Sequence, residues 1–463
     1  MSAQYLNARN LKERILVQGK LVLVTPTHLG TGDTDSPIDM PLIRDPLEGR
    51  ALLTGATIAG ALRNYLHLQN PRLAETLFGS VSTTTSRESY LVIDDAIGNK
   101  PGVEFRDGVA IDPQTRTAAD KKKFDYELLE AGTSFNLQFE LLVPQNGGTQ
   151  LVEGLAVCLT ALEEGEIRLG KRKRRGFGRC QVTQWAIQRF DMTQPQGMFA
   201  WLEYKPGKPV EGEGIARRLL GRALTDAERA AAQQRQCNLT IDVCVDGSIL
   251  IRADAGSDSG PDFVHLHSGG NPVVSGTSLA GALRQRVVKI ANTLDKPGRE
   301  IANILFGNYA YHNESDMQLT ASRVWVDETA IANPVNLVQS RIKIDRLTGS
   351  TFQEALFSEQ PVFGKGAQFR IHIRLEDPKK WEVGLLLLLL KDIWMGDLTI
   401  GGESSVGRGQ LKGLHAELKF AGKTWIFQAG DGKTVHVSGT DAAQLQTFVD
   451  QFHSMNDFGG HHE

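Results

Sequence analysis

The second half of the chain repeats the first, and this repetition limits the folds that the chain can adopt. The clearest pair of matching stretches is LLTGATIAGALRNYL (Leu52–Leu66) and VVSGTSLAGALRQRV (Val273–Val287). Six such stretches recur in the same order, and a glycine-rich stretch closes each series. Chance rarely preserves both order and spacing, so the sequence predicts a tandem duplication over about residues 15–188 and 237–415.

The duplication divides the 463 residues into four parts. Residues 1–188 and 237–415 are predicted to form two domains of one kind. Residues 189–236 are predicted to be a linker, because YKPGKPVEGEG is a loop signal, and TDAERAAAQQRQ within it is typical of a short capped helix. Residues 416–463 are predicted to add a small hairpin and a helix, because KTWIFQAG and KTVHVSG alternate polar and apolar residues.

Each repeat mixes strand and helix signals. Alternating stretches such as SFNLQFELLV predict strands, and stretches such as GLAVCLTALEE predict helices. The small residues at the start of one helix in each repeat, Gly55 and Gly276, predict the close approach of another backbone. The run GLLLLLL (Gly384–Leu390) is too short to span a bilayer and predicts a buried helix. The order β-α-β-α-β around an inserted hairpin predicts an α+β fold of the ferredoxin-like kind.

The glycine-rich stretches are GKRKRRGFG (Gly170–Gly178) and GGESSVGRG (Gly401–Gly409). The two stretches have glycines at matching positions, but only the first carries five consecutive cations. Glycine loops expose backbone N–H groups that hold phosphate, and cations strengthen such a contact. The alternative is a solvated charged turn. Neither stretch ends in the G-K-[ST] of a Walker A motif, so ATP chemistry has no support.

Composition indicates an ordinary protein with local rather than global affinity for anions. The net charge is -3, which argues against a general nucleic-acid coat but permits one basic track. The four cysteines have no C-x-x-C spacing, so neither a zinc site nor a disulfide framework is evident. The first residues lack the apolar core of a signal peptide, and we expect a cytoplasmic protein with no membrane partner.

Three stretches together resemble the RAMP superfamily: IDMPLIRDPLEGRALLTGATIAGALRNYL, AIDPQTRTAADKKKFDYELLEAGTSF and LGKRKRRGFG. More narrowly, they resemble the repeating backbone subunit of type III CRISPR effector complexes. The second half is similar to the same subunit, so the whole chain resembles the fused double-backbone subunit of type III-D systems. This resemblance implies two tandem ferredoxin-like (RRM-like) domains, each with a glycine-rich loop and a thumb hairpin inserted at about 107–135 and 341–369.

The resemblance implies that CRISPR RNA lies along these domains. Its backbone would pass the helices that begin at Gly55 and Gly276, and both glycine loops. Phe177 would be able to stack on a base. The RNA-binding candidates are Arg63, Gly170, Lys171, Arg172, Lys173, Arg174, Arg175, Gly176, Phe177, Gly178, Arg284, Gly401, Gly402, Gly407, Arg408 and Gly409.

Cleaving members of the family use an aspartate before an RDP segment, and PIDMPLIRDP places Asp39 on that position. A carboxylate there would deprotonate an RNA 2′-OH or hold a divalent metal, Mg or Mn, that assists the attack. Asp33 and Asp35 are nearby alternatives. The second repeat lacks the motif; Asp262 is its best positional match, and Asp258 competes with it. Whether the second repeat is catalytic stays open at this point.

Three functions follow as hypotheses. The first is a subunit that binds CRISPR RNA and cleaves complementary target RNA through Asp39, and through Asp262 if the second repeat is active. The second is a non-catalytic scaffold that only grips the guide. The third is an endonuclease that matures precursor CRISPR RNA, for which His28 is the well-placed early histidine. The expected partners are CRISPR RNA, target RNA and the other subunits of the complex.

Overall fold

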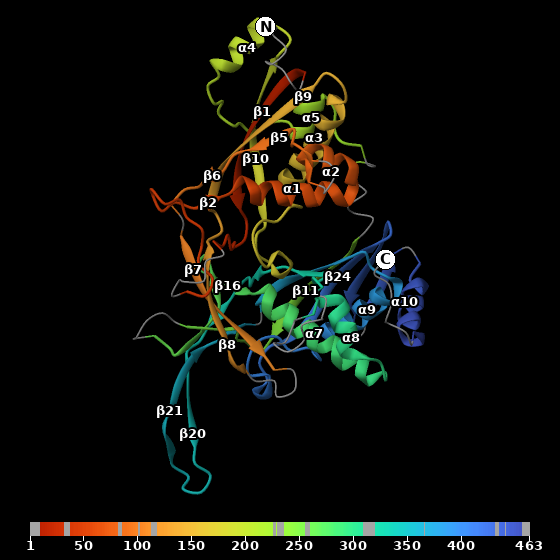
Figure 1. Cartoon of the computed structure of the whole chain (residues 1–463). Coiled ribbons are helices and arrows are strands. Elements are labelled where there is room, and N and C mark those ends of the chain that lie inside the picture. Colours follow the sequence, from red (N-terminus) through yellow and green to blue (C-terminus); the bar gives the residue numbers. More distant parts are fainter. Residues whose placement is uncertain are drawn as a thin grey trace. The chain divides into compact units, whose positions relative to one another are not determined.

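The computed structural model describes twelve stretches of the chain, drawn in colour in Figure 1. They are residues 10–31, 38–81, 86–100, 102–112, 118–225, 228, 236–254, 260–308, 320–364, 366–430, 435–439 and 441–455. The chain forms two compact units. The first comprises Met1–Gly108, Phe124–Lys173 and Phe177–Gln233, and the second comprises Val109–Lys123, Arg174–Gly176 and Gln234–Glu463.

The first unit is built on a four-stranded antiparallel sheet. Its strands are β1 (Leu11–Leu23), β5 (Leu91–Ile93), β9 (Ser134–Pro144) and β10 (Cys180–Asp191), in the order β10-β1-β9-β5. The central strand places Val17 opposite Phe139 on one side and Ile187 on the other. Alternate residues of β9 are buried, as its alternating sequence predicts.

Three helices share a core with this sheet: α1 (Gly55–Gln69), α2 (Pro71–Phe78) and α3 (Gly148–Glu163). The Thr54 hydroxyl caps α1 by accepting the Thr57 N–H at 3.3 Å. A Cβ on Gly55 would lie 2.2 Å from the carbonyl oxygen of Ile93, so the strand reaches this helix only because the position is glycine. The predicted close approach is therefore confirmed.

The second unit repeats this plan with two added strands. Its sheet has the order β17-β23-β11-β24-β25-β26, in which β24-β11-β23-β17 matches the four strands of the first unit. The strands are β11 (Gln236–Asp246), β17 (Val324–Val326), β23 (Gln368–Glu376), β24 (Gln410–Phe420), β25 (Lys423–Ala429) and β26 (Val435–Gly439). Helices α7 (Gly276–Thr293), α8 (Gly298–Phe306) and α9 (Lys380–Trp394) follow in the order of α1, α2 and α3.

Two further strands and a helix follow β24, which itself runs past the boundary expected at residue 415. Strands β25 and β26 pair as a hairpin, and helix α10 (Ala443–Ser454) follows. The leucine run lies in α9, where Leu385 and Leu389 are buried as predicted. A Cβ on Gly384 would lie 2.1 Å from the carbonyl oxygen of Phe448, so this glycine lets α10 pack closely on α9. His461 and His462, near the end of the sequence, lie outside the described residues.

Each repeat also carries an inserted strand pair. In the first repeat, β7 (Val103–Ile111) pairs with β8 (Ala118–Leu129). In the second, β20 (Gln339–Ile344) pairs with β21 (Thr351–Gln360), and Figure 1 shows this hairpin extending from its unit. The two strand pairs overlap the insertions expected at about 107–135 and 341–369, although each begins a few residues earlier.

The segment between the repeats is more ordered than a linker. It contains α4 (Pro195–Leu202) and α5 (Ile215–Leu220). Ile215 and Leu219, one helical turn apart, are buried in the core of the first unit. At the predicted capped helix, Thr225 Oγ1 accepts the Glu228 N–H and Glu228 Oε2 accepts the Thr225 N–H. Most of that helix lies outside the described residues. No helix of the described stretches is long and apolar enough to cross a membrane.

Candidate nucleic-acid interface

The first glycine loop is closed by backbone hydrogen bonds. The Lys171 N–H donates to His28 O at 3.0 Å, and the Gly178 N–H donates to Pro26 O at 3.1 Å. Gly178 has a φ of 77°, and a Cβ there would lie 1.9 Å from the carbonyl oxygen of Leu169. Only glycine satisfies both conditions.

The second glycine loop has the same closure. The Gly402 N–H donates to Leu250 O at 2.8 Å, and the Gly409 N–H donates to Ser248 O at 2.7 Å. Gly409 also has a φ of 77°, and its Cβ would lie 2.1 Å from Ile400 O. The two loops therefore share the same pattern of closing hydrogen bonds and the same requirement for glycine at the last position.

This closure changes how the loops would hold phosphate. The N–H groups of residues 171, 178, 402 and 409 already donate to carbonyls of the protein, as do those of Gly407 and Arg408, to Ser404 O and Glu403 O. A phosphate at either loop would therefore meet side chains rather than these N–H groups. Phosphate binding through side chains is therefore expected at the first loop, where Lys171 is exposed and Lys173 is half-buried.

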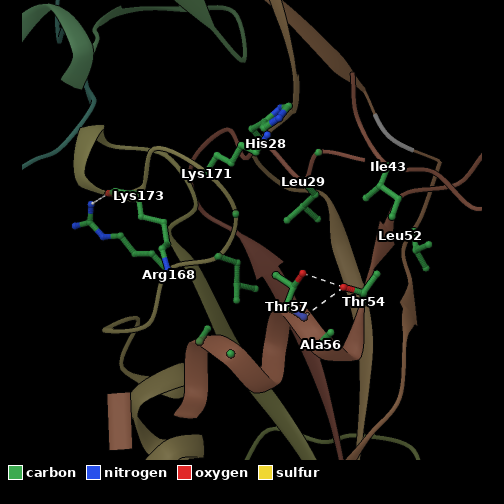
Figure 2. A pocket seen from close by; sticks show the side chains of 15 residues that line it. His28, Leu29, Ile43, Leu52, Thr54, Ala56, Thr57, Arg168, Lys171 and Lys173 are labelled. Atoms are coloured by element: carbon green, nitrogen blue, oxygen red, sulfur yellow. Dashed lines mark hydrogen bonds between the residues drawn. The ribbon is translucent and has the colours of Figure 1, made fainter. Parts of the chain in front are cut away.

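A cleft of about 330 Å³ lies beside the first loop in the first unit. Figure 2 shows the N-terminal turn of α1 on one side of it, with Thr54 and Thr57 hydrogen-bonded, and the cations on the other. Arg168, Lys171 and Lys173 supply positive charge, and Arg168 Nη1 donates to Lys173 O at 3.0 Å. The remaining lining residues are His28, Leu29, Gly30, Ile43, Leu52, Ala56, Gly60, Ala61, Leu169 and Gly170. Cations facing a helix N-terminus attract an anion such as a phosphate.

Phe177 is not presented to a base in this structure. Its ring is fully buried in a small cluster with Tyr126 and Leu128. The rings of Phe177 and Tyr126 have centroids 6.0 Å apart, and the Arg106 guanidinium lies 5.4 Å from the Phe177 ring. Stacking on a base would require this cluster to open, so RNA contact by Phe177 stays a prediction while its packing role is observed.

The other first-repeat cations occupy different surroundings. Arg172 has a φ of 56° and lies over the rings of Phe124 and Tyr126, at 4.6 and 4.8 Å. Arg174, which belongs to the second unit, lies 5.4 Å from the Trp325 ring and 3.8 Å from the Glu376 carboxylate. Arg175 is half-buried.

The helix arginines differ between the repeats. Arg63 is exposed on α1, as a phosphate contact requires. Arg284, on α7, donates to Gly307 O at 2.7 Å and to Asn303 Oδ1 at 2.5 Å. Its guanidinium therefore ties α7 to the end of α8. The RNA contacts of both arginines stay predictions.

Arg408 is buried rather than exposed. Only 3% of its side chain is accessible, and its guanidinium pairs with Glu359 at 2.5 Å and with Glu403 at 2.8 Å. It also donates to Ser248 Oγ and Gln339 Oε1. These bonds use four of the five guanidinium N–H groups, and the side chain is buried, so an RNA contact by Arg408 would require this network to open.

Asp39 lies at the base of the first inserted hairpin. Its Oδ2 accepts the backbone N–H of Asp125, in β8, at 2.9 Å. The next residue, Met40, forms a parallel bridge with Tyr126. The Asp39 side chain is exposed, so its carboxylate is held by a strand and still open to a ligand.

Asp262 occupies the equivalent place in the second repeat. Its Oδ2 accepts the backbone N–H of Ser358, in β21, at 2.6 Å. The next residue, Phe263, begins β14 (Phe263–His265) and is paired in parallel with Glu359. The hydrogen bonds from the Ser358 backbone and hydroxyl hold the pKa of Asp262 below its ordinary value, so this carboxylate is ionised at neutral pH.

The competing acids lie elsewhere in the chain. Asp33, Asp35 and Asp258 lie outside the described residues. Within the described stretches, no group of three or more His, Cys, Asp or Glu side chains is arranged to hold a metal ion. Asp39 offers one carboxylate. This donor set fits Mg²⁺ or Mn²⁺, which bind through one or two carboxylates, water and substrate phosphate.

His28 and His265 lie near these sites, and both are buried and hydrogen-bonded to the backbone. His28 is buried, and its Nδ1 lies 2.9 Å from Glu127 O, so Nδ1 carries the proton. Burial, with the charges of Lys171 and Arg172, lowers the pKa of His28. His265 is also buried: its Nε2 donates to Val273 O and its Nδ1 accepts from the Ile251 N–H.

Comparison with known proteins decides the family. A model of the RAMP superfamily matches residues 20–181 and, a second time, residues 256–412. The chain belongs to the RAMP superfamily. Each match covers one of the two repeats, so the duplication predicted from the sequence is a duplication of RAMP domains.

One curated relative of this RAMP protein is the CRISPR system Cms endoribonuclease Csm3 of Enterococcus italicus. It is 30% identical over 106 residues, which are 20% of this chain and 50% of that relative. The match therefore spans about half the length of the relative.

Sequence reasoning missed the residues beneath each glycine loop. Aligning the repeats pairs Phe177 with Arg408, and Tyr126 with Glu359. Both partners in one repeat are aromatic, and both partners in the other are charged and complementary. This joint change was the available signal that each pair is in contact.

Proposed function

We propose that the chain is a backbone subunit of a type III CRISPR effector complex, fused from two RAMP domains. It binds CRISPR RNA and cleaves complementary target RNA. The family match to both repeats and the similarity to a CRISPR endoribonuclease support the class. The proposed partners are CRISPR RNA, target RNA and the other subunits of such a complex, in the cytoplasm.

The topology supports this assignment in both units. The order β10-β1-β9-β5 has the first strand of the repeat in the centre and the last at an edge, as a ferredoxin-like domain requires. The hairpins β7–β8 and β20–β21 are the proposed thumbs. The proposed grip on the guide is the cationic cleft of the first unit, with Lys171 and Lys173 as phosphate ligands.

The observation that carries the proposed cleavage is the shared placement of two aspartates. Asp39 and Asp262 each accept an N–H from the second strand of a hairpin, at 2.9 and 2.6 Å. The second repeat lacks the PIDMPLIRDP motif, yet it holds a carboxylate in the same way. We therefore propose two cleavage sites, one per repeat, with Asp39 and Asp262 as the catalytic residues.

The proposed chemistry is attack by the target RNA on its own backbone. A 2′-oxygen bonds to the adjacent phosphorus as the bond to the 5′-oxygen breaks, leaving a cyclic phosphate and a 5′-hydroxyl. An aspartate carboxylate takes the 2′-OH proton, and water protonates the leaving 5′-oxygen. A divalent metal held by Asp39 would stabilise the phosphate charge. The N–H of Asp125 keeps the Asp39 carboxylate in one orientation.

A product map tests the proposal. Guide-loaded complex is incubated with end-labelled target RNA, using the wild type, Asp39→Ala, Asp262→Ala and the double variant. We expect each single variant to lose a different cut and to keep RNA binding. Unchanged cuts in all three variants, with the complex assembled, would exclude Asp39 and Asp262 as the catalytic residues.

The scaffold function is the second candidate. It is favoured by the dense packing of the second glycine loop, where Arg408 is used internally. The product map separates it from cleavage. Maturation of precursor RNA is less well supported, because the His28 ring is buried and hydrogen-bonded to a strand.

A further inference from the structure

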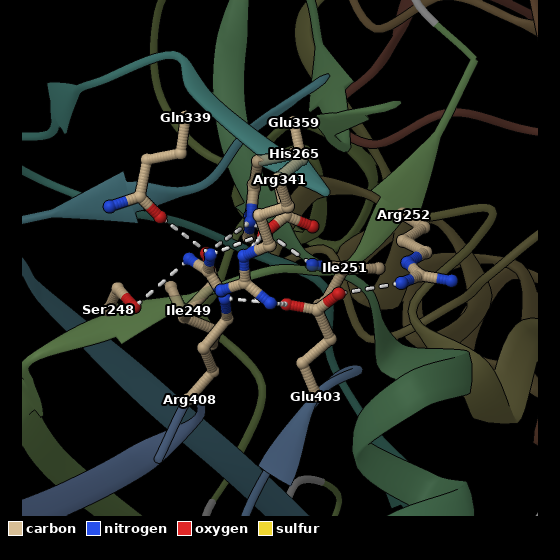
Figure 3. Close-up of polar contacts among 10 residues, drawn as sticks. All are labelled: Ser248, Ile249, Ile251, Arg252, His265, Gln339, Arg341, Glu359, Glu403 and Arg408. Carbon is tan, nitrogen blue, oxygen red and sulfur yellow. Dashed lines mark hydrogen bonds and ion pairs between the residues drawn. The ribbon is translucent and has the colours of Figure 1, made fainter. Parts of the chain in front are cut away.

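The second glycine loop is tied to the strand that holds Asp262. Figure 3 shows Arg408, from the loop, facing Glu359, from β21. The guanidinium lies 2.5 Å from Glu359 Oε1, and Glu359 is fully buried. The residue before Glu359 is Ser358, whose N–H donates to Asp262 at 2.6 Å. Loop, strand and aspartate therefore form one connected chain of contacts.

Other charged groups hold the same point of the strand. Arg341 Nε lies 3.0 Å from Glu359 Oε1, and the Arg341 guanidinium also pairs with Glu403. Glu403 belongs to the loop and has a φ of 62°, and Arg252 pairs with it at 2.7 Å. A buried, multiply paired carboxylate fixes its strand more firmly than a surface pair would.

The first repeat makes the same connection with aromatic rings. Phe177, at the loop position of Arg408, packs on Tyr126, at the position of Glu359. The residue before Tyr126 is Asp125, whose N–H donates to Asp39. Arg172 replaces Glu403, also with a positive φ, and lies over the Tyr126 ring. Both repeats thus have a contact between the glycine loop and the hairpin strand; it is aromatic in the first repeat and ionic in the second.

We propose that each glycine loop positions the aspartate of its own repeat, with Arg408 and Glu359 as positioning residues for Asp262, and Phe177 and Tyr126 for Asp39. This inference rests on the proposed function of the two aspartates. The loop holds the hairpin strand in place, and one N–H of that strand sets the orientation of the carboxylate. The same hairpin strand therefore contacts both the glycine loop, where RNA would bind, and the aspartate carboxylate at the base of the hairpin.

The chain supplies its own matched substitutions for a test. In guide-loaded complex, Arg408→Phe removes the ion pair, and Glu359→Tyr/Arg408→Phe imports the pair found in the first repeat. We expect the single variant to slow the cut assigned to Asp262 by roughly tenfold to hundredfold, because small misplacements of a catalytic group are costly. Its KM and the cut assigned to Asp39 should stay unchanged. The double variant should recover most of the rate.

A second measurement does not depend on cleavage. Hydrogen exchange of the Ser358 amide should be faster in Arg408→Phe than in the wild type and slow again in the double variant. Amides of β11 and β23 report whether the unit is folded; if Arg408→Phe is unfolded, Arg408→Lys replaces it, with a smaller effect in the same direction. If Asp262→Ala removes no cut, the proposed activity of the second repeat fails, and the exchange data still decide the positioning.

Three results would overturn the positioning proposal. Unchanged exchange at Ser358 in folded Arg408→Phe is the first. A rise in KM with an unchanged kcat is the second, because it would make Arg408 an RNA-binding residue. An equal loss of both cuts is the third, because it would indicate a general defect. Phe177→Ala provides the reciprocal case: it should slow the cut assigned to Asp39 and spare the other.

Discussion

The carboxylate of Asp262 accepts the backbone N–H of Ser358 at 2.6 Å, and the Ser358 hydroxyl lies 3.1 Å from the same oxygen. In the first repeat the equivalent residue is Asp125, which offers its N–H to Asp39 but has no hydroxyl to add. The backbone bond is thus common to the two repeats, and the hydroxyl bond is particular to the second.

Ser358→Ala should therefore make the second site resemble the first. Loss of the hydroxyl bond should raise the pKa of Asp262, because that bond helps to hold the pKa below its ordinary value. A carbon-detected NMR titration of the Asp262 carboxyl measures it. Ser340→Ala, on the paired strand β20, is the control and should leave that titration unchanged. A lower pKa in Ser358→Ala would contradict the assignment.

The cations of the first glycine loop should dominate the salt dependence of RNA binding. Replacing Lys171 and Lys173 with Gln should weaken binding and reduce the slope of log K against log salt by about 0.7 for each phosphate that the protein no longer neutralises. Fluorescence anisotropy at several salt concentrations measures the slope. Replacing Lys412 and Lys419, which pair with Asp246 and Glu417 on the second unit, changes charge equally and should leave the slope nearly unchanged. Equal slopes from the two double variants would refute the prediction.

Arg408→Met should destabilise the second unit by about 3–5 kcal/mol, because it leaves Glu359 buried without this partner. Arg408→Met/Glu359→Met should recover most of that loss. Arg370→Met, which breaks an exposed pair with Asp242, is the control and should cost less than about 1 kcal/mol. Urea unfolding followed by hydrogen exchange of β11 amides gives the free energies. A cost for Arg408→Met no larger than that of the control would show that the buried pair is unimportant.

Replacing Gly55, at the start of α1, should lower stability, whereas replacing Gly60, within α1, should not. Gly55→Ala would force a Cβ against Ile93 O and should cost about 1–3 kcal/mol of stability. Gly60→Ala meets nothing within 4 Å and should stabilise the helix by about 0.5–1 kcal/mol. Thermal melting compares the two variants, and a shift of both in the same direction would be inconsistent with this account.

His265 should make the second unit sensitive to mild acid. Burial lowers its pKa to about 4, from an ordinary 6.5, so between these values the unfolded chain binds a proton that the folded chain does not. The free energy of unfolding should therefore fall as pH drops from 6.5 to 4, by up to about 3 kcal/mol. His265→Gln, which keeps one donor and one acceptor, should remove this part of the pH dependence. Exposed His436→Gln should not, and identical pH profiles for the wild type and His265→Gln would exclude His265 as the cause.

The sequence predicted the architecture because a duplication shows itself in residue order. The tandem repeat, the helix at Gly384–Leu390 and the close approach at Gly55 follow from pattern and residue size, and each is confirmed by the family matches or the structure. The burial of the loop residues Arg408 and Phe177 could not be predicted from the sequence pattern. Arg408 and Phe177 look exposed among glycines and charges, yet they face inward, since that depends on the hairpin packed beneath them. Only the paired change at Tyr126 and Glu359 carried that information.

The aromatic contact and the ionic contact between a glycine loop and its hairpin place different constraints on how the contacting residues can change during evolution. Where rings pack on rings, as at Phe177 and Tyr126, one apolar residue can replace another in single steps of modest cost. Where a buried guanidinium meets a buried carboxylate, a lone change at Arg408 or Glu359 leaves the other buried charge without this partner, which is costly. Among descendants of this duplication, positions 126 and 177 should therefore drift separately, whereas positions 359 and 408 should change together or not at all.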